Sequence, residues 1–172
     1  MKNLDFASLS LQDALDFAIL IEEEAAERYQ ELADQMESHH TADAAQFYRF
    51  MIVNETKHGK ELMERRDHIF GDAPRNVDRS MLWEVEAPSY DRVHVFMSAR
   101  EALNVALEAE EKAYAFFVGA LEHVKDETVK KLFEELKGEE IEHQNLVKAE
   151  LAKLPPESTA DVSDYADEPV AQ

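Results

Sequence analysis

Hydrophobic residues recur every three or four positions along four long stretches of this chain, which is the spacing of one face of an α-helix. The pattern predicts an all-α protein with helices at about residues 10–37, 41–70, 90–124 and 126–154. All five prolines lie outside these stretches, as expected because proline disrupts a helix interior. Ser10 and Thr41 are suited to begin the first two helices, and Gly71 is suited to end the second.

The connecting segments predict how the helices are arranged. Few residues separate the first helix from the second, or the third from the fourth, so each pair is expected to form an antiparallel hairpin. Residues 71–89 form a long irregular connection that must carry the chain back across the bundle. We therefore expect residues 1–154 to form a ferritin-like antiparallel four-helix bundle with one long crossover between helices two and three. Residues 155–172 contain five acidic residues and no basic residue, and we expect a disordered acidic tail.

Acidic and histidine residues interrupt each hydrophobic stripe near the middle of its helix. Glu22 and Glu110 occupy positions in the first and third helices where a core residue is expected. The second and fourth helices each carry a Glu-x-x-His pair, whose two side chains share one helix face. A single pair of this kind is a weak signal, but the ordered set, with one interruption per helix, is the pattern of a dinuclear carboxylate metal site. The predicted metal ligands are Glu22, Glu55, His58, Glu110, Glu140 and His143.

Electrostatics favours this interpretation. Ionised carboxylates in an apolar core are very costly unless a positive charge compensates them, and two divalent cations would balance the four glutamates. Lys57, Lys60 and Lys137 lie near these glutamates in sequence but on other faces of their helices. The alternative is a helical interaction module without metal, in which the acids turn outward or pair with lysine and arginine.

The overall charge excludes some partners. The formal net charge is −20, from 38 acidic and 18 basic residues, so the chain should repel phosphate backbones and anionic lipids. We therefore expect no nucleic acid and no membrane as partner. No run of about 18 apolar residues is present, and residues 1–10 lack the apolar segment of a signal peptide. A cytoplasmic location is the resulting expectation.

The ligand types restrict the metal. Sites rich in carboxylates suit iron or manganese, and the absence of cysteine removes thiolate zinc sites. We expect two iron ions, because redox chemistry makes use of a bridged pair, with manganese or zinc as alternative occupants. Met51 and the other methionines are interpreted as core residues, and no haem is predicted.

Further residues are candidates to support the ligands. Asn54 and Glu139 each precede the glutamate of a Glu-x-x-His pair and could orient a histidine, or could simply face solvent. Tyr29 and Tyr114 could hydrogen-bond a glutamate, although core packing alone also explains them. Gly59 and Gly138 lie inside predicted helices, where glycine costs about 1 kcal/mol relative to alanine. Close packing at the site would explain them, as would a tolerated surface position.

At these residues the sequence resembles the rubrerythrin-like branch of the ferritin-like superfamily. The resemblance covers about residues 10–153 and is carried by the phrases at residues 18–29, 55–58, 106–113 and 140–143. It implies the bundle fold, a di-iron centre, a homodimer, and reaction of the ferrous site with peroxide or oxygen.

The sequence departs from that family in two ways. Rubrerythrins proper append a rubredoxin-like module whose four cysteines deliver electrons, whereas this chain has no cysteine, so the electron donor would be external and is unknown. Peroxidase-type members carry an extra carboxylate one turn from the third-helix glutamate, where this chain has Leu107 and Ala113.

Two functions remain open at this point. One is a non-haem di-iron oxidoreductase of peroxidase or ferroxidase type, in which ferrous iron is oxidised by peroxide or oxygen. The other is a non-enzymatic protein that binds, buffers or senses iron and whose metals mainly stabilise the bundle.

Overall fold

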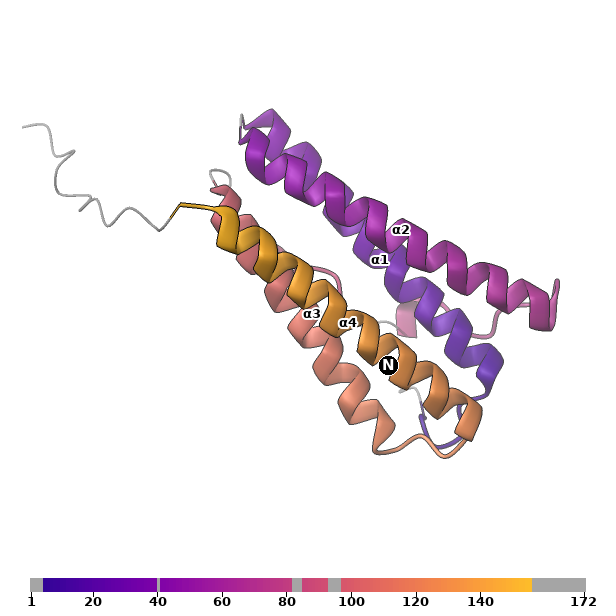
Figure 1. The fold of residues 1–172 in the computed structure, drawn as a ribbon. Coiled ribbons are helices and arrows are strands. Elements are labelled where there is room, and N and C mark those ends of the chain that lie inside the picture. Colours follow the sequence, from indigo (N-terminus) through magenta and orange to yellow (C-terminus); the bar gives the residue numbers. More distant parts are fainter. Residues whose placement is uncertain (1–4, 40, 82–84, 93–96, 156–172) are drawn as a thin grey trace, which may run out of the picture.

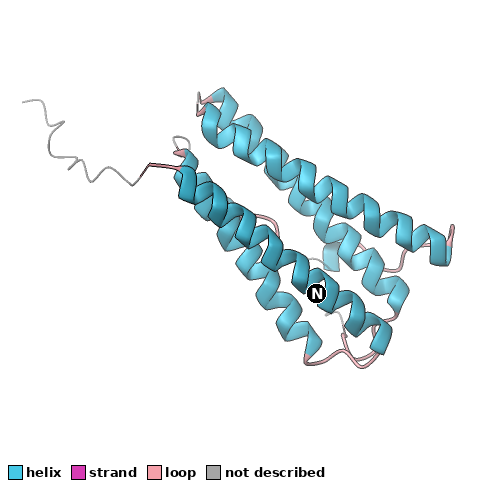
Figure 2. Ribbon diagram, in the orientation of Figure 1, coloured by secondary structure: helices cyan, strands magenta, loops and turns pink. Residues whose placement is uncertain are grey.

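The computed structural model describes residues 5–39, 41–81, 85–92 and 97–155. Its regular structure is entirely helical within these ranges (Figure 2). The four long helices are α1 (Leu11–Ser38), α2 (Ala42–Phe70), α3 (Ala99–Leu121) and α4 (Glu127–Lys153). Two short 3₁₀-helices, η1 (Arg79–Met81) and η2 (Tyr90–Arg92), lie in the connection between α2 and α3.

Local hydrogen bonds explain where the helices begin and end. The Ser10 side chain accepts a hydrogen bond from the Asp13 backbone at the start of α1, and Asp126 accepts two from the first turn of α4. Ser98 and Glu101 form a capping box at the start of α3. Gly71 has a positive φ of 53°, a conformation that favours glycine, and it ends α2 as predicted.

The third helix is shorter than the sequence pattern predicted. It begins at Ala99 instead of Tyr90 and ends at Leu121 instead of residue 124. The Ser98 capping box fixes this start, and Tyr90 belongs to η2 instead. Phe96, which falls inside the predicted third helix, lies outside the described residues, as do residues 156–172 of the predicted tail.

The helices form two antiparallel hairpins, α1 with α2 and α3 with α4, which pack together as a four-helix bundle (Figure 1). The crossover carries the chain back along α1, so that α3 runs in the same direction as α2. Gln12 donates to the Pro74 carbonyl over 2.9 Å, Arg79 donates two 2.6 Å hydrogen bonds to Glu27, and the Tyr90 hydroxyl donates to Glu31. The crossover is therefore attached to α1 at successive points along its length.

The interior contains two hydrophobic clusters separated by a polar layer. One, the Phe17 cluster, includes Leu15, Phe17, Ile21, Phe117, Phe133 and Leu136. The other, the Tyr48 cluster, includes Tyr29, Tyr48, Met51, Met97, Leu103 and Val147. Every helix contributes to both clusters, so each helix must cross the intervening layer.

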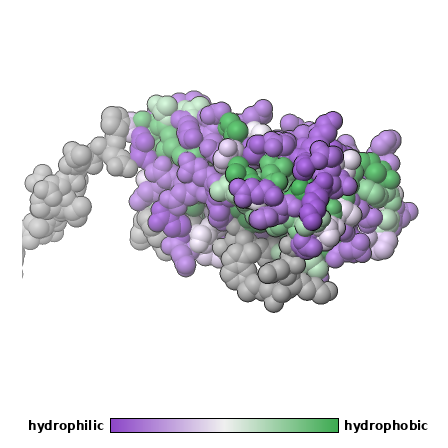
Figure 3. All heavy atoms as spheres, turned by 90° about the horizontal axis from the view of Figure 1, so that it is seen from below, coloured by the Kyte–Doolittle hydropathy of each residue, from purple (hydrophilic) through white to green (hydrophobic). Residues whose placement is uncertain are grey.

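One face of the bundle is largely polar. Figure 3 shows a face on which hydrophilic residues predominate and hydrophobic residues form smaller patches. Among the described residues, no helix combines the length and apolar character needed to cross a lipid bilayer.

Candidate metal centre

The predicted ligands occupy the layer between the two hydrophobic clusters. In α1, Ile21 is the last residue that belongs to the Phe17 cluster and Tyr29 is the first that belongs to the Tyr48 cluster. Glu22 lies between them. In α4, Glu140 and His143 lie between Leu136 and Val147 in the same way. Five of the six predicted ligands are buried and His58 is half-buried; the side chains of Glu55 and Glu110 are 0% exposed. The bundle therefore places these polar groups at its centre.

Potential metal-binding atoms converge in three overlapping groups, within each of which they lie no more than 4.8 Å apart. The first comprises Glu55, His58 and His143; the second Glu55, Glu86, Glu110 and His143; the third Glu22, His58 and Glu139. Glu140 belongs to none of these groups, although its carboxyl lies close enough to Glu110 for their charges to interact. Glu55, His58 and His143 each belong to two groups, and of these three only Glu55 is a carboxylate, with two oxygens that could contact different ions.

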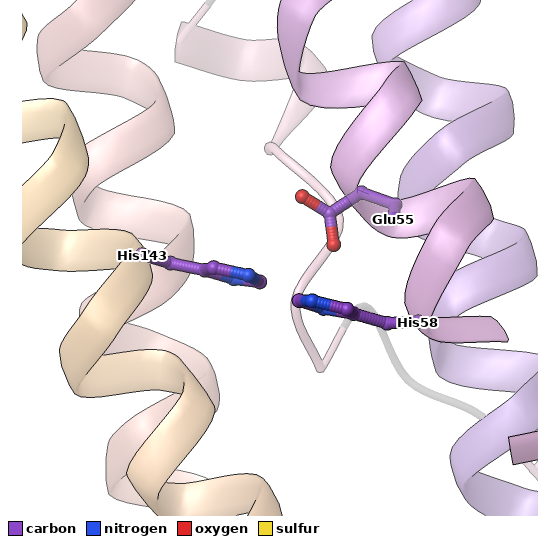
Figure 4. Close-up of side chains that lie close together, drawn as sticks. All are labelled: Glu55, His58 and His143. Carbon is purple, nitrogen blue, oxygen red and sulfur yellow. The ribbon is translucent and has the colours of Figure 1, made fainter. Parts of the chain in front are cut away.

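The two histidines meet across the interior. His58 from α2 and His143 from α4 lie with their rings parallel, 4.8 Å between centroids and 2° between planes. Figure 4 shows the two rings pointing toward one another, with the Glu55 carboxylate directed into the same space. Residues from the two hairpins therefore face one small volume.

Glu86 was missed by the sequence analysis. It lies in the crossover, is 1% exposed, and joins Glu55, Glu110 and His143 in the second group. An additional carboxylate was sought on the third helix, at the positions of Leu107 and Ala113, whereas the structure supplies one from the irregular connection. The only available signal was a single acid between Val85 and Ala87, which no helical periodicity distinguishes.

The carboxyls of the layer are poorly stabilised as anions. Burial, and then the neighbouring charge of Glu86, raise the pKa values of Glu22, Glu55 and Glu140 well above their usual range. Burial and then the charge of Glu110 raise the pKa of Glu86 to about 7. A cation bound among these carboxyls would lower their pKa values and keep them ionised.

The histidines differ in their surroundings. Burial, and then the positive charge that His143 can carry, lower the pKa of His58. Burial would also lower the pKa of His143, but the hydrogen bond and charge of Glu110 outweigh it and raise this pKa. Nδ1 of His143 lies 3.1 Å from a carboxylate oxygen of Glu110. That contact leaves Nε2 of His143 for another partner.

Many polar atoms of the layer lack a hydrogen-bond partner among the described residues. These buried atoms are Nδ1 of His58, Nε2 of His143, both carboxylate oxygens of Glu55 and of Glu86, and one oxygen each of Glu22 and Glu140. Buried polar groups are normally paired, and each unpaired one costs about 1–3 kcal/mol. Almost all of these atoms carry lone pairs suited to a metal ion, so the residues fit a carboxylate–imidazole metal site.

Tyr29 and Gly59 shape the site. The fully buried Tyr29 hydroxyl donates a hydrogen bond of 3.2 Å to Glu110. A Cβ atom at Gly59 would lie 3.2 Å from Cβ of Glu22, so glycine allows α2 to approach α1 closely at this ligand. At Gly138 no atom lies within 4 Å of such a Cβ, so close packing does not explain that glycine.

The other candidate supporting residues have different positions. Glu139 is half-buried and shares the third group with Glu22 and His58. The Asn54 side-chain nitrogen is buried without a hydrogen-bond partner in the described part of the chain. Tyr114 is half-buried, and within the described ranges no hydrogen bond joins it to the site.

Comparison with known proteins agrees with this geometry. Residues 13–151 match the sequence profile of the family described as rubrerythrin. A crystal structure of an uncharacterized conserved protein from Magnetospirillum magnetotacticum MS-1 is 31% identical and superposes with a TM-score of 0.67. The match covers 86% of this chain and 97% of that one. No curated protein matches the chain. The sequence match over most of the bundle, together with the fold, shows that this chain belongs to the rubrerythrin family.

Proposed function

We propose that the polar layer binds two iron ions and that, when these ions are ferrous, peroxide or oxygen oxidises them. The proposed ligands are Glu22, Glu55, His58, Glu110, Glu140 and His143, with Glu55 shared between the two ions. The observation that carries the proposal is the convergence of carboxylates and imidazoles from all four helices on one region. Most of these groups have a buried lone-pair atom without a hydrogen-bond partner among the described residues. Such an arrangement of ionised carboxylates is costly to fold unless a cation occupies it or the carboxyls take up protons.

The chain's own residues would hold and shield the pair. Two ferrous ions held there would supply the two electrons that, with two protons, reduce one hydrogen peroxide to two waters. The Phe17 and Tyr48 clusters close the layer on both sides and limit access of bulk water. Tyr29 fixes one oxygen of Glu110, and Glu110 in turn contacts Nδ1 of His143. These contacts orient two ligands before metal arrives.

Re-reduction requires a donor from outside this chain, because it has no cysteine to hold a rubredoxin-type iron centre. Manganese and zinc remain alternative occupants of a site of this composition.

We also propose that the protein is a homodimer. Phe50 and Val53, three positions apart on α2, are 41% and 65% exposed, and Ile141 on α4 is 44% exposed. Covering these side chains would remove apolar surface from water. Sedimentation velocity is expected to give twice the chain mass, and a monomer at all concentrations would contradict the dimer.

Stopped-flow oxidation of the ferrous protein tests the redox function. The protein is loaded anaerobically with two ferrous ions per chain and mixed with peroxide or with oxygen. Rapid appearance of the absorbance of a ferric pair, saturating at two irons per chain, is expected. Oxidation no faster than that of free ferrous iron would contradict the redox function and favour the non-enzymatic iron-binding role.

Glu111→Ala is the matched control for Glu110→Ala, because Glu111 is the exposed neighbour on the same helix. We expect rapid oxidation to be lost in the Glu110 variant and kept in the Glu111 variant.

A further inference from the structure

We infer that Glu86, from the crossover, is a seventh metal ligand, contributing a carboxylate to the ion held by Glu55, Glu110 and His143. This inference rests on the proposed two-metal site and deepens it. The side chain is 1% exposed, and one of its oxygens belongs to a group whose atoms lie within 4.8 Å of one another. It is the one member of that group that does not come from a long helix.

The backbone on the C-terminal side of Glu86 is held in place by two cations from different helices. Lys112 of α3 donates to the Ala87 carbonyl over 2.9 Å, and Arg28 of α1 donates to the Pro88 carbonyl over 2.5 Å. The flanking residues Val85 and Ala87 are themselves buried. The Arg28 guanidinium also lies 3.6 Å from the centre of the Tyr90 ring, which helps to hold it in this position. The crossover is thus attached to both helices beside the site, and it delivers one carboxylate between them.

The contacts of Glu86 favour a ligand over a structural carboxyl. When both carboxyls are ionised, neither oxygen of Glu86 and neither oxygen of Glu55 has a hydrogen-bond partner within the described residues, although the two carboxyls lie close enough to share a proton. A proton shared between these two carboxyls would satisfy one acceptor and leave the others unpaired. A metal ion between them accepts lone pairs from both carboxylates at once.

A seventh ligand makes the two metal positions unequal. Carboxylate oxygens of Glu86 and Glu110 belong to the same group of converging atoms as His143, whereas those of Glu22 and Glu139 belong to the same group as His58. With Glu86 included, the five buried glutamates contribute five negative charges against four positive charges from two ferrous ions. The oxidised pair, with six positive charges, is therefore favoured relative to a site with four glutamates.

Metal binding to Glu86→Gln tests this role without reference to activity. The variant keeps the size of the side chain and removes the charge. Anaerobic calorimetric titration with ferrous iron is expected to show the wild type binding two ions, and the variant binding one of them at least about 10–100-fold more weakly, since that is the loss found for residues that only support a metal ligand. Titration with Co²⁺ should show altered visible bands for one ion only. The exposed residue Glu111 supplies the matched control Glu111→Gln, which should bind as the wild type does.

Stability without metal distinguishes a ligand from a structural residue. In chelator, Glu86→Gln should melt at the same temperature as the wild type or higher, because a buried acid has been removed; with metal, it should melt lower. Glu86→Asp, which keeps the charge but shortens the reach, should also bind one ion more weakly. If the wild type and the glutamine variant bind two ions with equal affinities and equal Co²⁺ spectra, the role of Glu86 is refuted and the two-metal site stands. If the wild type binds no metal, the proposed function fails first.

Discussion

His58 and His143 stack with parallel rings, 4.8 Å apart, although they come from two different hairpins. Two imidazolium cations at this distance would repel one another, so the stack favours at least one neutral ring. Neutral imidazole is the form that binds metal. Each ring also keeps one nitrogen without a hydrogen-bond partner in the described structure, namely Nδ1 of His58 and Nε2 of His143. The stack is therefore a pair of available ligands at the junction of the hairpins.

Removing a ligand from this junction should remove a metal position. We expect Glu55→Ala to lose at least one of two bound ions, because its carboxylate belongs to two of the three groups of converging atoms and has an oxygen for each ion. His143→Ala should lose one. Inductively coupled plasma mass spectrometry after anaerobic loading and desalting gives the number of ions per chain. Retention of two ions by either variant would show that the ligand assignment is wrong.

The Tyr29 hydroxyl should stabilise the fold through Glu110. Tyr29→Phe removes a buried hydrogen bond to a carboxyl, and we expect the free energy of unfolding to fall by about 1–3 kcal/mol. Urea unfolding in the presence of chelator measures this change without a contribution from metal. Tyr114→Phe is the control, since no hydrogen bond joins Tyr114 to the site within the described ranges. Equal losses in both variants would contradict a specific role for Tyr29.

The two helix glycines should respond differently to alanine. Gly138→Ala is expected to stabilise the protein by up to about 1 kcal/mol through helix propensity, because its new methyl group meets open space. Gly59→Ala should lose that gain and weaken metal binding, because its methyl group would lie 3.2 Å from Cβ of Glu22. Thermal melting and metal titration measure the two effects. A Gly59 variant as stable as the Gly138 variant, with unchanged metal affinity, would contradict close packing at Glu22.

Stability of the metal-free protein should fall as the pH rises. Burial raises the pKa of Glu86 to about 7 in the folded chain from its ordinary value of 4.5, so its contribution to stability is fully present below about 4.5 and is lost as the pH rises through about 7. Glu22, Glu55 and Glu140 shift in the same direction. The lowered pKa of His58 opposes this trend, but only one group is involved. Melting temperatures in chelator at pH 5.5 and pH 7.5 compare the two conditions.

We expect the higher melting temperature at the lower pH, and a smaller difference in Glu86→Gln. Added metal should reverse the trend, because ions compete with protons for the same carboxylates. A metal-free protein that becomes steadily more stable from pH 5.5 to 7.5 would contradict the burial of unpaired carboxyls.

The burial of the candidate ligands on the helices could be predicted because helical periodicity marks a core position whatever residue occupies it. Glu22 and Glu110 stand out for that reason, and Glu55 and His58 lie three apart on one face. Glu86 lies in the irregular crossover, where no helical periodicity marks the buried positions. Its burial depends on Arg28 and Lys112 holding the crossover, which are tertiary contacts between residues far apart in the sequence.

The start of the third helix was misplaced for a different reason. The pattern of apolar residues continues before Ala99, which favoured an earlier start. The Ser98-x-x-Glu101 capping box was present in the sequence and marks the true beginning, so this error was avoidable.

The metal content of the protein purified without added metal tests the central claim most directly. Native mass spectrometry of the intact chain, with elemental analysis of the same sample, gives both the number and the identity of bound ions. We predict two ions per chain, chiefly iron, and their loss in a variant lacking both Glu55 and His143. A folded wild-type chain that carries no metal, and takes up none when ferrous iron is supplied anaerobically, would contradict the account.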